Sequence, residues 1–130
     1  MARRSSRYPT ELELEILKIL WRDGPSSVRH VRRALEDSRK LAHTSVMTMM
    51  TIMTDKGYLK RAKKGRSYTY KPRVTQDEVS SGMLSDIVDR VFNGCTATAV
   101  VNLLETGDID EAEFEDLRRF VRRRVKEKRK

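Results

Sequence analysis

The sequence holds only one cysteine, Cys95, among its 130 residues. A single thiol forms no disulfide within the chain, and it does not supply the set of sulfur ligands that a structural zinc site uses. We therefore expect neither a disulfide framework nor a metal centre. Because free cysteines most often serve as small apolar residues of the interior, we expect Cys95 to be buried.

Long apolar runs are also missing. No uninterrupted apolar stretch approaches the ~20 residues that a membrane-spanning helix needs, so we expect no membrane anchor. The first residues, MARRSSRYPTE, are basic, but no apolar segment follows them as it does in a secretory signal. These two absences favour a cytoplasmic protein.

Aromatic residues make up only 6% of the chain, and there are two histidines. Proteins that bind single strands or RNA usually stack bases on exposed aromatic rings, which disfavours that class. Tyr68 and Tyr70 lie in a basic segment, however, and keep single-stranded nucleic-acid or RNA binding as the alternative function. His30 and His43 lack the partners of a catalytic triad, a zinc site or a phosphate-binding loop. We therefore expect no enzymatic activity and no cofactor.

Acidic residues are unevenly distributed. The formal charge is +9 and the isoelectric point is near 10.0, which favours a polyanionic partner. Residues 1–73 hold 18 Lys and Arg against 7 Asp and Glu, residues 74–117 hold 1 against 11, and residues 118–130 hold 9 against 1. This segregation predicts two modules, residues 1–73 and residues 74–130, the second ending in a basic tail.

The first module begins with two short amphipathic helices. Thr10 with Glu13 forms a capping-box pattern before an apolar stripe, and Gly24-Pro25 ends that helix. A second helix is expected after Ser26-Ser27. Its inward residues are Val28, Val31 and Leu35.

Segment 41–59, LAHTSVMTMMTIMTDKGYL, is expected to form a third helix. The i, i+3, i+4, i+7 spacing of a core-facing stripe is followed by Val46, Met49, Met50 and Met53. The opposite face carries short uncharged side chains, whose hydroxyl and methyl groups suit phosphates, base edges and thymine in a DNA groove. Taken alone, this face is equally well explained by β-branched residues that happen to lie outside. The candidate DNA-contacting residues are His43, Thr44, Ser45, Met47, Thr48 and Thr51.

A basic hairpin is predicted directly behind this helix. Tyr58-Leu59 and residues 67–71 have strand composition, and KKGR between them makes a glycine-containing turn. Seven basic residues and no acidic one lie between Lys60 and Arg73. Three short helices followed by a basic hairpin are the layout of a winged helix-turn-helix, in which the third helix enters the major groove. The candidate phosphate contacts on the hairpin are Lys63, Lys64 and Arg66.

The second module is predicted to contain three helices. Thr75 with Glu78 and Asp110 with Glu113 are start signals, while Asn93-Gly94 and Gly107 separate the segments. A domain of this size cannot bury its apolar stripes alone, so we expect a second chain to cover them and make a homodimer. The candidate dimer contacts are Ile87, Val91, Val101, Leu104, Leu117 and Val121.

The chain resembles the BlaI/MecI family of bacterial transcription regulators, the penicillinase repressors. The resemblance rests on TELELEILKILW, on TSVMTMMTIMTDKGYL, on GRSYTYKP and on the order of the three C-terminal helices. It implies a mostly α-helical homodimer whose N-terminal winged helices bind an inverted-repeat operator in double-stranded DNA. It also implies repression of transcription, with interlocked C-terminal helices holding the dimer together.

Some members of that family release DNA when a membrane sensor-protease system triggers cleavage of an Asn-Phe bond. The matching bond here is Asn102-Leu103, so the asparagine is matched and the phenylalanine is replaced. Copper-responsive relatives carry a Cys-x-Cys tail, whereas this chain ends in RRRVKEKRK and is not expected to sense copper in that way. The basic run from Arg118 is longer than the resemblance implies, and favourable placement of cations at a helix C-terminus is its simplest explanation.

Overall fold

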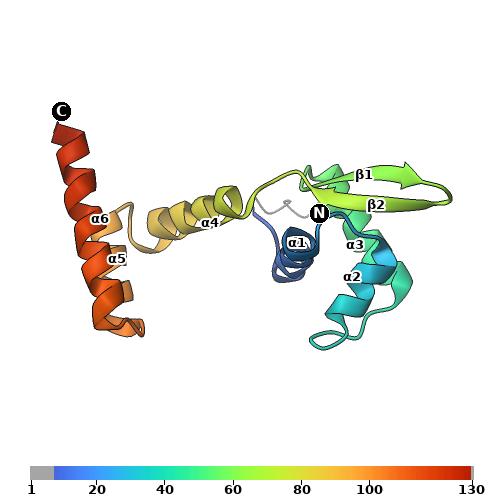
Figure 1. The fold of residues 1–130 in the computed structure, drawn as a ribbon, viewed down its shortest axis with the longest axis horizontal. Coiled ribbons are helices and arrows are strands. Elements are labelled where there is room, and N and C mark those ends of the chain that lie inside the picture. The colour runs from blue at the N-terminus through green and yellow to red at the C-terminus, as the bar shows by residue number, and fades with distance from the viewer. Residues whose placement is uncertain (1–7, 130) are drawn as a thin grey trace. The chain divides into compact units, whose positions relative to one another are not determined.

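The computed structural model describes residues 8–129, without the side chain of residue 129. The basic residues before Tyr8 and the last residue of the predicted basic tail, Lys130, lie outside the described residues. Figure 1 shows the order of elements, which is α1 (Glu11–Asp23), α2 (Val28–Leu35), α3 (His43–Asp55), β1 (Leu59–Lys64), β2 (Ser67–Pro72), α4 (Gln76–Val91), α5 (Thr96–Thr106) and α6 (Glu111–Arg129). The predicted mostly α-helical fold with one β-hairpin is confirmed. Over the described part of the chain, every helix is too short or too polar to cross a membrane.

Side-chain caps start the first two helices, as the sequence predicts. The Thr10 hydroxyl accepts from the backbone N–H of Glu13 at 3.2 Å, and the Glu13 carboxylate accepts from the backbone N–H of Thr10 at 2.8 Å. Ser27 accepts from the backbone N–H of His30 at 3.1 Å. These bonds satisfy amide groups that have no partner inside the helix.

Helices α1, α2 and α3 share one core with the hairpin. The stripe predicted on α3 is confirmed, since Val46, Met50 and Met53 are fully buried and Met49 packs against the same cluster. Glu13 is buried as well, and its carboxylate lies 3.0 Å from the Lys56 ammonium at the end of α3. The other fully buried large residues are Ile16, Leu17, Leu20, Val31, Leu35, Leu59 and Tyr70.

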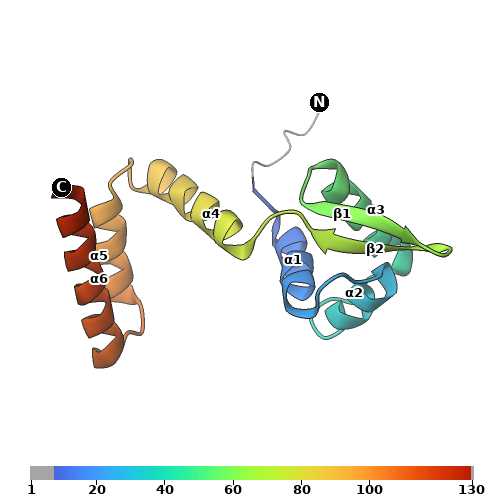
Figure 2. The same cartoon turned by 45° about the horizontal axis from the view of Figure 1, so that its top comes forward.

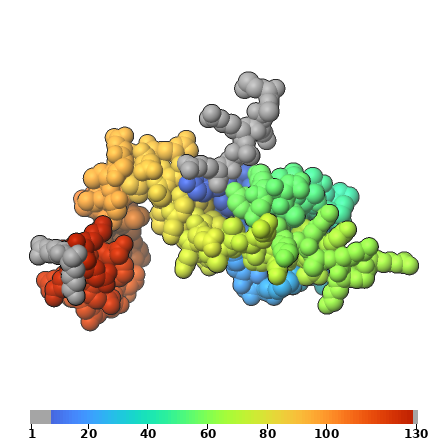
Figure 3. Space-filling view, turned by 90° about the horizontal axis from the view of Figure 1, so that it is seen from above, coloured from blue at the N-terminus to red at the C-terminus, as the bar shows by residue number. Residues whose placement is uncertain are grey.

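Strands β1 and β2 form an antiparallel hairpin with a tight turn. Lys64 pairs with Ser67, and Gly65 adopts a φ of +65°, which glycine tolerates at the first position of such a turn. At the other end of the hairpin, Ser26 and Tyr70 exchange two backbone hydrogen bonds of 2.9 and 2.8 Å. In the space-filling view the hairpin projects beyond the helices of its unit (Figure 3). The predicted winged helix-turn-helix is therefore confirmed.

The chain packs as two units that divide between Ser85 and Asp86, inside α4. The division lies beyond the predicted boundary because the start of α4 belongs to the first core, in which Val79 is buried and against which Met83 packs. The Trp21 indole N–H also donates to the Val74 carbonyl at 2.9 Å. As functional modules, residues 1–73 and 74–130 stay a prediction.

The second unit holds the end of α4 together with α5 and α6, which run alongside each other (Figure 2). Asn93 and Gly94, with φ of +51° and +81°, form the turn that follows the end of α4. Asp110 accepts from the backbone N–H of Glu113 at 2.8 Å and caps α6. The expectation that Cys95 is buried is wrong. Cys95 is exposed because it is the N-cap of α5, where the Thr98 hydroxyl donates to its sulfur at 3.0 Å and lowers the pKa of the thiol.

Candidate nucleic-acid interface

The outer face of α3 carries no charged side chain between His43 and Asp55. Of the predicted contacts on this helix, five are exposed: His43, Thr44, Ser45, Met47 and Thr48. Thr51 is half-buried and its hydroxyl donates to the Met47 carbonyl at 2.9 Å. The helix thus presents hydroxyl and methyl groups without the Lys and Glu side chains of an ordinary solvated helix.

The hairpin turns one of its faces toward α3. Because side chains alternate along a strand, the register of Arg61 with Tyr70 and of Lys63 with Tyr68 puts these four residues on the same face. The Arg61 guanidinium lies over the Tyr68 ring, 4.5 Å from its centre. A hollow of about 260 Å³ between α3 and this face is lined by Met47, Thr48, Thr51, Ile52, Arg61, Tyr68 and Tyr70.

A second hollow, of about 560 Å³, opens where the starts of α2 and α3 meet the tip of the hairpin. His43 and Met47 reach it from α3, Arg29 from α2 and Arg66 from the hairpin. Its remaining lining residues are Ser27, Val28, Ser67, Tyr68 and Tyr70. The start of α3 has no side-chain cap, since its N-cap is Ala42. Two arginines therefore border one concave surface beside the uncapped start of α3, which is a chemical environment suited to phosphate.

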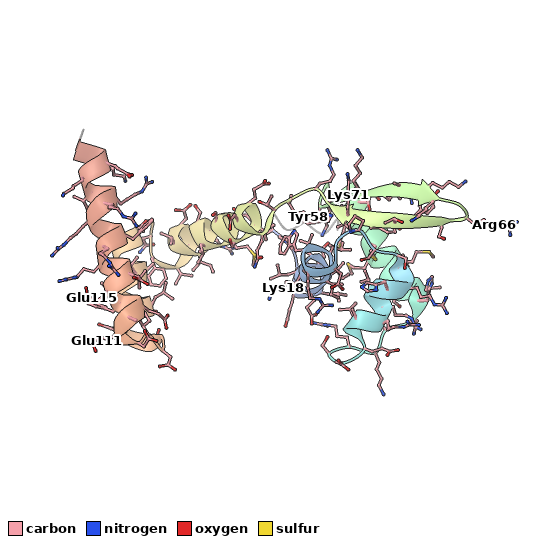
Figure 4. The ribbon with its side chains drawn as sticks, viewed as in Figure 1. Lys18, Tyr58, Arg66, Lys71, Glu111 and Glu115 are labelled. Atoms are coloured by element: carbon pink, nitrogen blue, oxygen red, sulfur yellow. The ribbon has the colours of Figure 1, made fainter. Side chains whose placement is uncertain are left out.

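The predicted basic contacts of the hairpin are all exposed but do not share one face. Arg66 lies at the tip and Lys71 near the base (Figure 4). By strand alternation Lys63 lies on the face that carries Arg61, while Lys64 lies on the opposite face. That opposite face borders a third hollow, lined by Pro25, Lys60, Ala62, Thr69 and Lys71. The hairpin therefore carries positive charge on both faces and at its tip.

Three residues of this surface are missing from the predicted contacts, namely Arg29, Arg61 and Tyr68. Arg61 could have been found from the sequence, because a buried Tyr70 fixes which alternate positions of the hairpin face the helices. Tyr68 follows by the same argument. Arg29 could not, because its position beside the hairpin tip depends on how α2 packs.

One polar contact beside the interface, between Asp23 and His30, links α1 to α2. Asp23 accepts from Arg22 at 2.8 Å and lies 2.8 Å from His30 Nε2. The hydrogen bond from Arg22, followed by that from His30, lowers the pKa of the Asp23 carboxyl well below its usual range. Within the described part of the chain, no group of three or more His, Cys, Asp and Glu side chains is arranged to hold a metal ion.

The six residues predicted as dimer contacts are all exposed within the single chain. The exposed fraction is largest for Val91, at 66%, and smallest for Leu104, at 39%. Other large apolar side chains of α5 and α6 are exposed as well, among them Val100, Leu103, Phe114, Phe120 and Val125. Ala99 is the only apolar residue that is buried in the described part of the second unit.

The Asn102-Leu103 bond lies inside α5. Both residues are exposed, and the Asn102 carbonyl accepts a hydrogen bond of 2.8 Å from the Thr106 hydroxyl. Gly94 precedes the helix and Gly107 is its C-cap. A protease that needs an extended substrate therefore requires local opening of this helix.

Comparisons with known proteins show similarity to one family of regulators. The family model described as "Penicillinase repressor" matches residues 9–123. "Penicillinase repressor" of Bacillus licheniformis is 24% identical over 108 residues, which cover 83% of this chain and 84% of that protein. "Transcriptional regulator BlaI" of Mycobacterium tuberculosis is 31% identical over 105 residues, which cover 79% and 76%. The solution structure of monomeric BlaI of B. licheniformis with the blaP half-operator is 23% identical, has a TM-score of 0.48, and covers 57% of this chain and 90% of that chain.

Proposed function

The chain belongs to the penicillinase repressor family of DNA-binding transcriptional repressors, and from this premise we propose that it acts as a homodimer on an inverted-repeat operator. In this proposal the outer face of α3 reads bases in the major groove, and the hairpin contacts the flanking phosphates. The two C-terminal units hold the two N-terminal units, which we call the heads, at a fixed separation.

One observation carries the proposal. A helix face without charged residues lies beside a hairpin whose described side chains include arginine and lysine but no carboxylate. The Arg61 guanidinium is stacked on Tyr68 at the edge of the hollow that separates the two elements. Such a surface combines an uncharged helix that can fit closely against the bases with a basic hairpin that can bind the DNA backbone. In sequence-specific DNA binding, base contacts provide specificity and phosphate contacts position the protein.

The dimer is supported by the exposed apolar residues of the second unit. Burial of such a side chain contributes about 25 cal/mol of stabilising free energy for each Å² of apolar surface removed from solvent. This contribution is missing while the side chain stays exposed. These apolar residues recur on α4, α5 and α6 and stay exposed among the described residues of the single chain. A second copy presents the same surface, and a two-fold axis pairs it with itself.

We also propose that repression ends when the link between the two heads is lost. The bond that the family pattern points to is Asn102-Leu103, which lies in the second unit and leaves the α3 face intact. The partner for this step is a sensor-protease system.

The direct test is a binding competition. Operator fragments are first selected from genomic DNA by the full-length protein, and each is then competed with random duplex, single strands and structured RNA. We expect the affinity for the selected duplex to exceed that for random duplex by at least 10³-fold, which is the lower end of the range for specific DNA binding. Preferential displacement by single strands or RNA would instead establish the alternative function.

A further inference from the structure

Helix α6 is divided by charge along its length. Its first half carries Glu111 and Glu115, which Figure 4 shows near one end, and side chains ending in nitrogen follow along the rest of the helix. Between positions 118 and 128 there are seven Lys and Arg and one Glu. A helix that only needed to be solvated would mix the two signs.

Four of these seven basic residues also gather on one side of α6. At 100° per residue, the apolar residues Phe114, Leu117, Val121 and Val125 form one stripe. The opposite side carries what we call the arginine face, which consists of Arg119, Arg122, Arg123 and Lys126. An open groove of about 620 Å³ is lined by three of these residues together with Asp116.

Interactions within the chain neutralise this face only at its edge. Arg119 pairs with Asp116 at 2.5 Å, whereas Arg122, Arg123 and Lys126 have no ion pair among the described residues. Like charges at i and i+4, such as Arg119 with Arg123 and Arg122 with Lys126, repel each other and destabilise an isolated helix by a few tenths of a kcal/mol per pair.

The helix dipole does not explain the arginine face. Its favourable effect on cations falls off within the last turn, and α6 continues to Arg129. Arg119, Arg122 and Arg123 lie more than one turn before that end. A bound anion would relieve their repulsion, and guanidinium groups are well suited to phosphate.

We propose that the arginine face of α6 is a second DNA-binding surface, which contacts backbone phosphates of duplex outside the operator half-sites. It contributes charge and no sequence information, so it increases affinity for long duplexes of any flanking sequence. The surface is separate from the α3 face and the hairpin, since it lies in the other unit of the chain.

The test uses the full-length protein and two duplexes. One ends at the outer edges of the selected operator, and the other continues on both sides with random sequence. The double variant R122Q/R123Q should lose affinity for the long duplex and lower its salt slope by about two units per chain, at ~0.9 for each phosphate contact. Binding to the short duplex should change much less.

Two matched variants decide between charge on this face and other causes. R122K/R123K keeps the charge and should keep most of the salt slope, while R124Q/K128Q removes two charges outside the arginine face and should leave the long-duplex preference in place. Sedimentation of all variants reports any change in oligomeric state. An unchanged slope in R122Q/R123Q would overturn the proposal and leave an acidic protein as the occupant of the face.

Equal losses in R122Q/R123Q and R124Q/K128Q would also overturn it, because net charge alone would then account for the effect. The proposed operator function fails differently, through a lack of preference for the selected duplex over a random duplex of the same length.

Discussion

Substitutions of Thr48 and Arg66 are predicted to affect DNA binding in different ways, although both residues border the same interface. Thr48 lies on the uncharged face of α3, so Thr48→Ala should remove a base contact and cost about 1–3 kcal/mol on the operator but little on random DNA. Arg66 lies at the hairpin tip, so Arg66→Ala should weaken binding to all sequences and lower the salt slope by about one unit. Fluorescence anisotropy at several salt concentrations separates the two effects.

Each of these variants is the control for the other, since both side chains are exposed and neither belongs to the core. If Thr48→Ala leaves the ratio of operator to random affinity unchanged, the α3 face does not read bases at this position.

Tyr58 gives the N-terminal unit a predicted sensitivity to alkaline pH. Burial, and then the charge of Glu13, raise the pKa of the Tyr58 phenol. The unfolded chain therefore loses this proton first, so the contribution to stability is intact below about pH 10 and is lost as pH rises through the folded pKa. Tyr58→Phe should reduce this alkaline loss, as measured by denaturant unfolding at neutral and alkaline pH. Tyr68→Phe, on the exposed hairpin, is the control, and an equal effect in both variants would refute the assignment.

At the scale of elements, local signals in the sequence were sufficient for the helices. The Thr10 box, the Ser27 cap and the methionine stripe of α3 depend on residues a few positions apart, so the sequence alone predicts them. The face that Arg61 and Tyr68 share follows from alternation along the hairpin, and the exposure of Cys95 follows from where α5 begins. The position of Arg29 beside the hairpin tip and the burial of Val79 in the first core depend instead on packing between distant segments, which no short pattern encodes.

The two ends of helix α4 are predicted to have different roles, one in the N-terminal core and the other in self-association. Val79, near its start, is buried in the N-terminal core, so Val79→Ala should lower the free energy of unfolding of that unit by about 1–2 kcal/mol. Val91, at its end, is exposed, so Val91→Ala should leave that unit unchanged and weaken self-association instead. Denaturant unfolding and sedimentation equilibrium measure the two effects. Finding that Val91→Ala destabilises the N-terminal unit while association is unaffected would refute this division.

At the scale of the whole molecule, affinity should depend on two linked heads. In the proposed dimer, the second half-site is bound from an effective concentration that the first contact sets. We expect the full-length protein to sediment as a dimer at micromolar concentration and to need two half-sites about one helical turn, or a multiple of it, apart. A monomer that binds one half-site as tightly as the full operator would contradict this prediction.

The same linkage predicts how the proposed cleavage would release DNA. Cutting Asn102-Leu103 removes the last part of α5 and all of α6 from the heads, and the loss of effective concentration is worth roughly 10²-fold or more in affinity. Because the bond lies in a helix, cutting requires α5 to open first, and Gly94 and Gly107 at its ends favour such opening. We expect intact-protein mass spectrometry of cells under inducing stress to show a fragment ending at Asn102. Asn102→Ala should keep the target genes repressed, whereas Glu105→Ala, an exposed change on the same helix, should not. Derepression with the full-length mass unchanged would rule out cleavage and leave an effector that acts on the intact dimer.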